Sequence, residues 1–478
     1  MFYQVIIFTI VIFFILSEVK RLHLSYQLRH IPGPTEIPFI GCKYILSSNK
    51  ITDIESLCYE ICTAKTVKMF VLHRVAIVTS DCDLLKIILS DKACADRPYV
   101  FKFLDLEYGL SSSKYNFWRP LRKGLNCTFN QQVINDLIPT FDKNYSILIR
   151  DLMKFTNTGA FDIHEVISNG VFASISETIF HEIINGDFGP HELEEIEDII
   201  CQRIINPLLH LNVIYKMTSL YKQDRQIRHA IYEALQQFIT KRRIEILSNT
   251  DLLTSKNILD RLITMKVNGM ALDDMQITEN LTNLLVGGFE TTASALCYTL
   301  LALAMHPEAQ EKCFEEINEV FQGKFDFTPD KMKELKYLDM VIKETLRLFP
   351  PVPVSARENI HNINFNGVTI PKKTILVLNI FQLHRNPEYW GEKSLEFYPE
   401  HFLPENIEKR DFHTYLPFTA GSRNCIGTPY ALTSIKVGLV HILSKFRLKT
   451  PLKMNELKFK FSITLKITNG FMIELNER

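Results

Sequence analysis

Two stretches of the chain are apolar on almost every helical face, and each predicts a helix in a different environment. Residues 1–17 form a nearly unbroken hydrophobic run that is followed by Lys20, Arg21 and Arg29. As a helix this run would reach roughly 26 Å, slightly short of a bilayer core of about 30 Å. Because the charges follow the run and no small-residue cleavage site accompanies it, the pattern favours a membrane anchor over a cleaved signal peptide.

The second apolar stretch covers residues 274–305 and is stopped by His306 and Pro307. A helix that is apolar all round is buried, either in a membrane or through the centre of a large domain. Asn283, Glu290 and several threonines interrupt the stretch, so it predicts a buried central helix.

Strand patterns are shorter than helical ones. Residues 67–72 and 76–79 are rich in β-branched and apolar residues and predict a hairpin in a small sheet. Residues 31–34, which read Ile-Pro-Gly-Pro, cannot continue a helix and predict a stiff bend. The fold class predicted is mainly α with a smaller β portion.

No Gly/Ser linker, repeat or charge block divides the rest of the chain. We therefore expect an anchor over residues 1–20, a linker with a Pro-rich hinge over 21–38, and one large domain over 39–478. A hydrophobic content of 46% and 33 phenylalanines are enough for a large core that encloses a ligand cavity.

Charge and cysteine usage narrow the class of protein. Lys+Arg and Asp+Glu both number 54, which argues against a nucleic-acid partner. The ten cysteines are scattered without a small-domain disulfide pattern, and nine of them are expected to be reduced.

The tenth, Cys425, stands in a distinctive loop. A cysteine sulfur binds iron as the anion, which needs nearby positive charge and backbone N–H groups. Gly421 and Gly427 permit a positive φ, so the loop can fold its amides around the sulfur and then begin a helix. Arg423 can reach a carboxylate, and Phe418 can shield the sulfur. An isolated cysteine would more often be an inert buried thiol, but this spacing predicts an iron ligand.

These five residues read Phe-x-x-Gly-x-Arg-x-Cys-x-Gly, which resembles the haem-binding signature of the cytochromes P450. The resemblance extends over nearly the whole chain and implies the cytochrome P450 fold. It implies a haem b whose iron is bound by Cys425, so that residues 39–478 form the haem-thiolate catalytic domain. Residues 383–387 and 423–427 look most like insect microsomal P450s related to the fatty-acid ω-hydroxylases.

Other segments match further motifs of that family. Trp118 and Arg122, at i and i+4 on one predicted helix face, resemble the pair that holds a haem propionate, and Arg357 matches a second propionate-binding arginine.

Glu344 and Arg347 resemble the buried Glu-x-x-Arg pair of the family, whose network is normally completed by another arginine. Here that position is His401. A neutral imidazole cannot replace a bidentate guanidinium, so we expect a looser core or weaker haem retention at higher pH.

The central helix contains Gly287-Gly288-Phe289-Glu290-Thr291-Thr292, which resembles the oxygen-activation motif of the family. By that resemblance Gly288 opens room for dioxygen, Thr291 hydrogen-bonds the activated oxygen, and Glu290 relays protons from solvent. Close helix packing through Gly287 and Gly288 is the alternative, because two glycines would cost a helix about 1 kcal/mol each relative to alanine.

The implied reaction is monooxygenation of a lipophilic substrate with O2 and electrons from NADPH. NADPH-cytochrome P450 reductase is the implied partner, cytochrome b5 is a second candidate, and Arg119 and Lys123 are candidates for docking an acidic reductase. The positive flank after residue 17 places the catalytic domain on the cytosolic face of the endoplasmic reticulum membrane.

Several alternatives stay open. The substrate could be a fatty acid, a hormone or a xenobiotic. The apolar patch at residues 204–215 could touch the membrane or form a buried helix. A haem-thiolate isomerase or dehydratase, which needs no reductase, and a non-catalytic haem or lipid carrier are the alternative functions.

Overall fold

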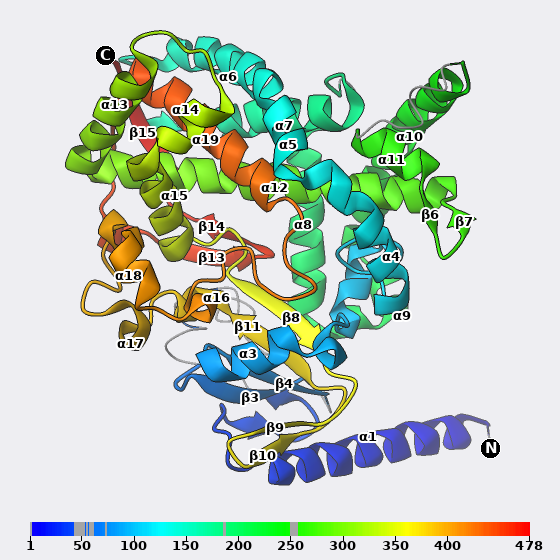
Figure 1. Cartoon of the computed structure of the whole chain (residues 1–478). Helices are drawn as coiled ribbons and strands as arrows, with labels where there is room; N and C mark the ends of the chain where they lie inside the picture. Colours follow the sequence, from blue (N-terminus) through cyan, green and yellow to red (C-terminus); the bar gives the residue numbers. More distant parts are fainter. Residues whose placement is uncertain are drawn as a thin grey trace.

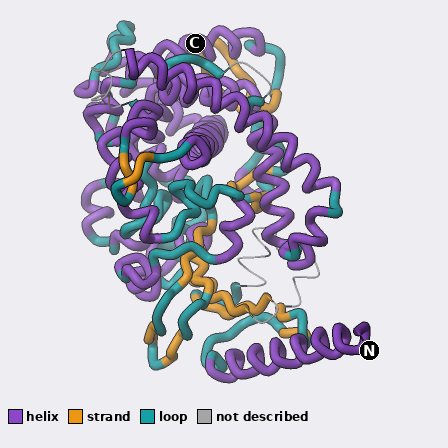
Figure 2. The backbone as a smooth tube through the Cα atoms, turned by 90° about the vertical axis from the view of Figure 1, so that its right-hand side faces the viewer, coloured by secondary structure: helices purple, strands orange, loops and turns teal. Residues whose placement is uncertain are grey.

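The computed structural model describes residues 2–42, 53, 56, 62–71, 74–184, 188–248 and 257–478 of the chain. Helices predominate, and a group of strands lies beside the N-terminal helix (Figure 2), which confirms the mainly α prediction with a smaller β portion. Leu72, at the end of the predicted strand over residues 67–72, and Cys58, one of the nine cysteines expected to be reduced, lie outside the described residues.

The helices follow one another along the whole chain. They are α1 (Phe2–Gln27), α3 (Cys82–Ser90), α4 (Tyr115–Leu125), α5 (Gln131–Asp136), α6 (Ile138–Leu152), α7 (His164–Phe180), α8 (Pro190–Ile205), α9 (Asn212–Lys216), α10 (Ser219–Ser248), α11 (Ile258–Thr264), α12 (Asp274–Met305), α13 (Pro307–Phe321), α14 (Pro329–Glu334), α15 (Lys336–Leu348), α16 (Ile380–Leu383), α17 (Pro387–Trp390), α18 (Pro404–Glu408) and α19 (Thr428–Lys445).

The strands are short and form several small sheets. They are β1 (Glu36–Ile37), β2 (Gly41–Cys42), β3 (Thr66–Val71), β4 (Arg74–Thr79), β5 (Phe161–Asp162), β6 (Lys266–Val267), β7 (Met270–Ala271), β8 (Val354–Glu358), β9 (Ile363–Phe365), β10 (Val368–Ile370), β11 (Ile375–Asn379), β12 (Phe446–Lys449), β13 (Phe459–Ser462), β14 (Thr464–Ile467) and β15 (Met472–Glu477).

The largest sheet has the order β1-β2-β3-β4-β11-β8. Its β3 and β4 pair antiparallel, with Val67 opposite Val78, and this pairing confirms the predicted hairpin. β11 joins β4 in parallel and β8 antiparallel, so the segment after α15 is brought next to the N-terminal hairpin. Arg357 lies on β8 within this sheet.

The central helix α12 runs across the middle of the molecule (Figure 1). It begins with a capping box, in which Asp273 and Gln276 bond each other's backbone N–H groups, and it ends before Pro307. Among the described residues it is the one helix long and apolar enough to cross a membrane, and 78% of its most apolar window is buried within the protein. The prediction of a buried central helix is therefore confirmed.

The N-terminal helix α1 extends to Gln27 and so includes the first residues of the predicted linker. It lies along the edge of the molecule beside the sheet of β3 and β4 (Figure 1). Phe8 and Leu16 are exposed, whereas Arg21 is buried, pairs with Glu18 at 2.9 Å and also pairs with Glu36. The exposed apolar face suits the predicted anchor, and Arg21 connects the helix to β1 through Glu36.

The apolar patch at residues 204–215 is not a buried helix. α8 ends at Ile205, and α9 begins at Asn212. Leu208, Leu211 and Val213 are 63%, 59% and 74% exposed. The buried-helix alternative is therefore wrong for these side chains, and contact with a membrane stays a prediction.

Candidate functional site

The Cys425 loop folds back on itself just before α19. The Cys425 N–H donates to the Phe418 carbonyl at 3.0 Å and closes the loop. Gly421 has a φ of +73°, and a Cβ there would lie 2.0 Å from the Leu89 carbonyl oxygen, so this position requires glycine. Gly427 caps α19 with a φ of −81°, so the positive φ predicted for it is wrong. A Cβ at Gly427 would lie 3.8 Å from the Cys425 sulfur, in ordinary van der Waals contact with it.

The Cys425 sulfur is accessible but poorly hydrated. Its side chain is exposed by surface area, yet loss of hydration is the largest influence on its pKa, which is raised. The N–H of Gly427, the Arg122 charge and Thr428 act in the opposite direction. A bound metal ion deprotonates a coordinating thiol outright, so the loop suits a thiolate held jointly by protein and metal.

Three arginines lie together beside this loop, of which Arg357 and Arg423 are buried and Arg97 is half-buried. Arg423 donates to the carbonyls of Ser113 at 2.6 Å and Ala95 at 3.0 Å. Arg357 donates to the Arg423 carbonyl at 3.4 Å. Arg97 donates to the Ala356 carbonyl at 3.0 Å, next to Arg357 in the chain. We call Arg97, Arg357 and Arg423 the arginine cluster.

The arginine cluster has no carboxylate partner among the described residues, since none of its members forms an ion pair there. Burial, followed by the Arg357 charge, lowers the pKa of Arg423 to about 9, and burial lowers the pKa of Arg357 to about 10. Burial and the other two guanidiniums lower the pKa of Arg97. Mutually repelling buried cations of this kind fit an anionic ligand with more than one carboxylate, which haem with its two propionates is.

Arg97 was missed by sequence reasoning, because no local motif marks it. It enters the cluster through a backbone bridge between Asp96 and Glu358, which places it beside β8. That pairing joins segments about 260 residues apart in the chain, and a signal of this kind cannot be read from spacing.

The predicted propionate pair Trp118 and Arg122 lies on α4, and both side chains face the Cys425 loop. The Arg423 guanidinium lies 4.2 Å from the Trp118 ring centroid, and Trp118 is buried. Arg122 donates to the Asn424 carbonyl at 2.8 Å and to its Oδ1 at 2.9 Å. In this structure Arg122 therefore fixes the loop, and its contact with a propionate stays a prediction.

The Glu344 and Arg347 pair is fully buried on α15 and is bidentate, at 2.7 and 2.8 Å. His401 reaches the same carboxylate, with Nδ1 3.1 Å from Glu344 Oε1, and the Tyr398 N–H adds a bond of 2.8 Å. Arg410 donates to the His401 carbonyl at 2.6 Å. The imidazole thus makes one contact with Glu344, while the Glu344 charge stays compensated by Arg347.

The oxygen-activation motif lies in the middle of α12. A Cβ at Gly288 would lie 2.8 Å from Ile175 Cδ1 on α7, whereas a Cβ at Gly287 would meet nothing within 4 Å. Close helix packing is therefore what Gly288 serves, and the open position is Gly287. Thr291 Oγ1 donates to the Gly287 carbonyl at 2.7 Å.

Glu290 is 2% exposed, and its Oε1 accepts a bond of 3.2 Å from Thr464 on β14. Burial, followed by the Glu194 charge, raises the pKa of Glu290. Its other oxygen, Oε2, has no hydrogen-bond partner among the described residues. Glu290 therefore faces α8 and β14.

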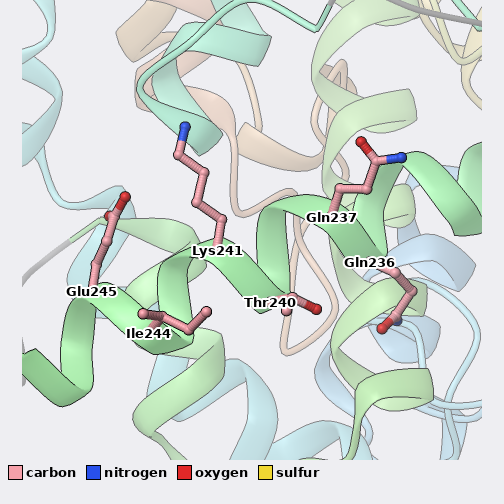
Figure 3. A pocket seen from close by; sticks show the side chains of 6 residues that line it. All are labelled: Gln236, Gln237, Thr240, Lys241, Ile244 and Glu245. Carbon is pink, nitrogen blue, oxygen red and sulfur yellow. The ribbon is translucent and has the colours of Figure 1, made fainter.

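A separate pocket of about 670 Å³ is lined by residues of α10, among them Gln236, Lys241 and Glu245 (Figure 3). Its labelled side chains all come from one helix and point in different directions, and Lys241 pairs with Glu182 at 2.8 Å. A site with a single wall and no convergent polar groups lacks the features of a ligand site, and the pocket shares no residue with the Cys425 loop.

Comparison with known proteins gives the family. The family model for Cytochrome P450 matches residues 31–475. "Probable cytochrome P450 313a4" of Drosophila melanogaster is 28% identical over 99% of this chain and 98% of its own length. "Probable cytochrome P450 4p3" of the same species is 31% identical over 83% and 81%, and "Cytochrome P450 4c21" of Blattella germanica is 29% identical over 96% and 95%.

The fold and the thiol loop define a haem-thiolate enzyme, and the chain belongs to the cytochrome P450 family. It is a monooxygenase that uses haem iron, O2 and electrons from a redox partner on a lipophilic substrate. Its relatives include insect P450s of the 313 group and of the group that contains 4p3 and 4c21, so the chain is an insect P450 related to the latter group.

Proposed function

We propose that Cys425 is the axial ligand of the haem iron and that the arginine cluster, with Trp118 and Arg122, binds the haem propionates. The observation that supports this most strongly is the arginine cluster, with two buried guanidiniums and one half-buried one, which forms no ion pair with a carboxylate among the described residues and lies beside an accessible thiol. Phe418 and Gly427 would leave the sulfur shielded yet unobstructed.

We further propose that the enzyme hydroxylates a lipophilic substrate, of the fatty-acid, hormone or xenobiotic class, with NADPH electrons delivered by NADPH-cytochrome P450 reductase. Bound haem supplies the redox chemistry that places one atom of O2 into the substrate. On this chain Thr291 would position the oxygen by hydrogen bonding, Gly287 and Gly288 would set the space along α12, and Glu290 would move protons. Arg119 and Lys123 on α4 would dock the reductase, and cytochrome b5 is a candidate second donor.

We also propose that residues 1–20 anchor the protein in the endoplasmic reticulum membrane, with residues 39–478 as the catalytic domain on the cytosolic face. The exposed side chains of Phe8, Leu16 and Val19 support this, because a hydrophobic face of that size on a terminal helix favours a bilayer. The exposed patch of Leu208, Leu211 and Val213 could then touch the same bilayer and admit the substrate.

The experiment that tests the proposal begins with the carbon monoxide difference spectrum of the reduced protein, which reports whether a thiolate holds the iron. NADPH oxidation and dodecanoate hydroxylation are then measured with and without reductase. We expect a strongly red-shifted Soret band and turnover that needs NADPH. A normal band without the shift would overturn the Cys425 assignment, and turnover of a peroxide substrate without NADPH would favour the isomerase or dehydratase alternative.

A further inference from the structure

A second group of buried titratable side chains lies beside α12, where α8 and β14 pack against it. Its members are Glu290 of α12, Glu197 of α8 and Thr464 of β14, with exposed fractions of 2%, 5% and 2%. We call these three residues the acid bridge. Buried carboxyl groups are unusual enough to require a physical account.

The acid bridge contains one hydroxyl between two carboxyl groups. Thr464 Oγ1 lies 3.2 Å from Glu290 Oε1 and 3.4 Å from Glu197 Oε2. A hydroxyl has a single hydrogen, so two full hydrogen bonds at Thr464 Oγ1 require that one carboxyl be protonated and donate to the hydroxyl oxygen. The Ser462 carbonyl, 3.3 Å away, is the other acceptor for that hydrogen, and its use would require protons on both carboxyls. In each arrangement the bridge holds at least one proton.

The charges around the acid bridge also favour a protonated carboxyl. Burial, followed by the Glu290 charge, raises the pKa of Glu197, while the Lys466 ammonium and the Thr464 bond lower it. The charged groups that face the pair are Glu194 and Asp198 from α8, His164 from α7 and Lys466 from β14, and Asp162 from β5 acts on Glu194 in turn. Lys466 lies 3.3 Å from Asp198, so its charge is shared.

The bridge is connected to solvent at one end. Polar atoms of His164, Glu194 and Glu290 all lie within 4.8 Å of one another. The side chains of His164 and Glu194 are 25% and 27% exposed, so both exchange protons with water. The unpartnered Oε2 of Glu290 is the atom left to receive a proton from them.

We propose that Glu197, Thr464 and Glu290 share a stored proton, and that His164 and Glu194 replenish it from solvent for use on the Thr291 side of α12. In the transfer, Glu197 gives its proton to Thr464 Oγ1 as Thr464 gives its own to Glu290, so one proton moves and no electron does. A proton that leaves Glu290 is replaced from water through His164 or Glu194. The destination of the proton rests on the proposed function, whereas the sharing does not.

Infrared spectroscopy of the holoenzyme tests the sharing without any turnover. A protonated carboxyl has a carbonyl stretch that moves in D2O, and we expect one at pH 8 in the wild type. It should be lost in Glu197→Gln and shifted in Thr464→Val, and unchanged in Glu195→Gln, a substitution on the same helix outside the group. A band that is insensitive to both Glu197→Gln and Thr464→Val would overturn the shared proton.

NADPH oxidation by the holoenzyme with reductase, in H2O and D2O across pH, tests the supply route. His164→Phe, which keeps the ring stacked on Phe471, and Glu194→Gln should lower the rate by about tenfold or more and raise the solvent isotope effect. His229→Phe, at a histidine that is 70% exposed on α10, serves as the control.

The outcomes separate the two proposals. A wild type that oxidises no NADPH would count against the proposed function, while the infrared result would still decide the sharing. Variants with an unchanged carbon monoxide spectrum, wild-type rates and wild-type isotope effects would overturn the supply route through His164 and Glu194.

Discussion

The arginine cluster and the acid bridge each bring groups of like charge together inside the protein. They differ in how the repulsion is relieved, by a bound anion in the first and by proton uptake in the second. The guanidiniums of Arg97, Arg357 and Arg423 keep their protons at any physiological pH, so the cluster stays charged and needs an anion from outside. The carboxyls of Glu197 and Glu290 can take up protons and become neutral where they are. A buried cationic cluster thus indicates a ligand, and a buried acidic one indicates proton storage.

The largest effect should come from removing Cys425, the proposed iron ligand of the haem whose propionates the arginine cluster would bind. Cys425→Ser replaces the thiolate by a weak oxygen ligand, and we expect complete loss of the red-shifted Soret band and of monooxygenase turnover. Cys127→Ser, at an exposed free cysteine, is the control and should behave as the wild type. Retained turnover in Cys425→Ser would mean that another residue binds the iron.

A second substitution separates ligand binding from folding. Arg357→Met removes one charge of the arginine cluster, and we expect haem affinity to fall by about 10–100-fold. The melting temperature of the haem-free protein should stay equal or rise, because a repelled buried charge is gone. Haem titration and calorimetry measure the two effects, with the exposed Arg150→Met as control. A parallel loss of haem-free stability would show that Arg357 is structural.

The acid bridge predicts a stability change that depends on pH. The folded-state pKa of Glu197 is raised above its ordinary value of 4.5, so its contribution is fully present below that value and is lost as pH rises through the folded pKa. Glu197→Gln cannot lose a proton, so it should be more stable than the wild type at pH 8, by about 1–3 kcal/mol, and show little gain at pH 4.5. Thermal melts at both values check this, and a gain that is constant with pH would contradict it.

The smallest effect is expected at His401, which belongs to neither group. Because Glu344 already receives two bonds from Arg347, His401→Arg should slow haem loss by no more than the equivalent of about 1 kcal/mol. Haem transfer to apomyoglobin across pH measures it. Identical curves for the two proteins would remove His401 from any role in haem retention.

Features that depend on neighbours in the chain could be predicted from the sequence. The Cys425 loop, the central helix and the hairpin of β3 and β4 follow from local spacing or periodicity, whereas the buried pair of Glu344 and Arg347 was expected from the family resemblance.

Features assembled from distant segments could not be predicted. Arg97 joins Arg357 through a bridge between strands, and Thr464 joins Glu290 across 174 residues. The sequence showed where the glycines stand but not what each one does. The backbone at Gly427 has a negative φ, and Ile175 fills the space beside Gly288. Which atoms face a glycine is a property of packing that no motif contains.

The buried Arg21 affects how the enzyme would be oriented on a membrane and where its N-terminus can be truncated. Arg21 ties α1 to Glu36, and Lys68 donates to the Ser25 carbonyl at 3.2 Å and the Leu28 carbonyl at 3.1 Å. If a bilayer takes up the first turns of α1, the orientation of α1 in the bilayer would therefore fix the orientation of the rest of the protein relative to the membrane. A truncated form for crystallisation should start after Gln27 rather than at residue 21, where Arg21 would keep Glu36 but lose Glu18.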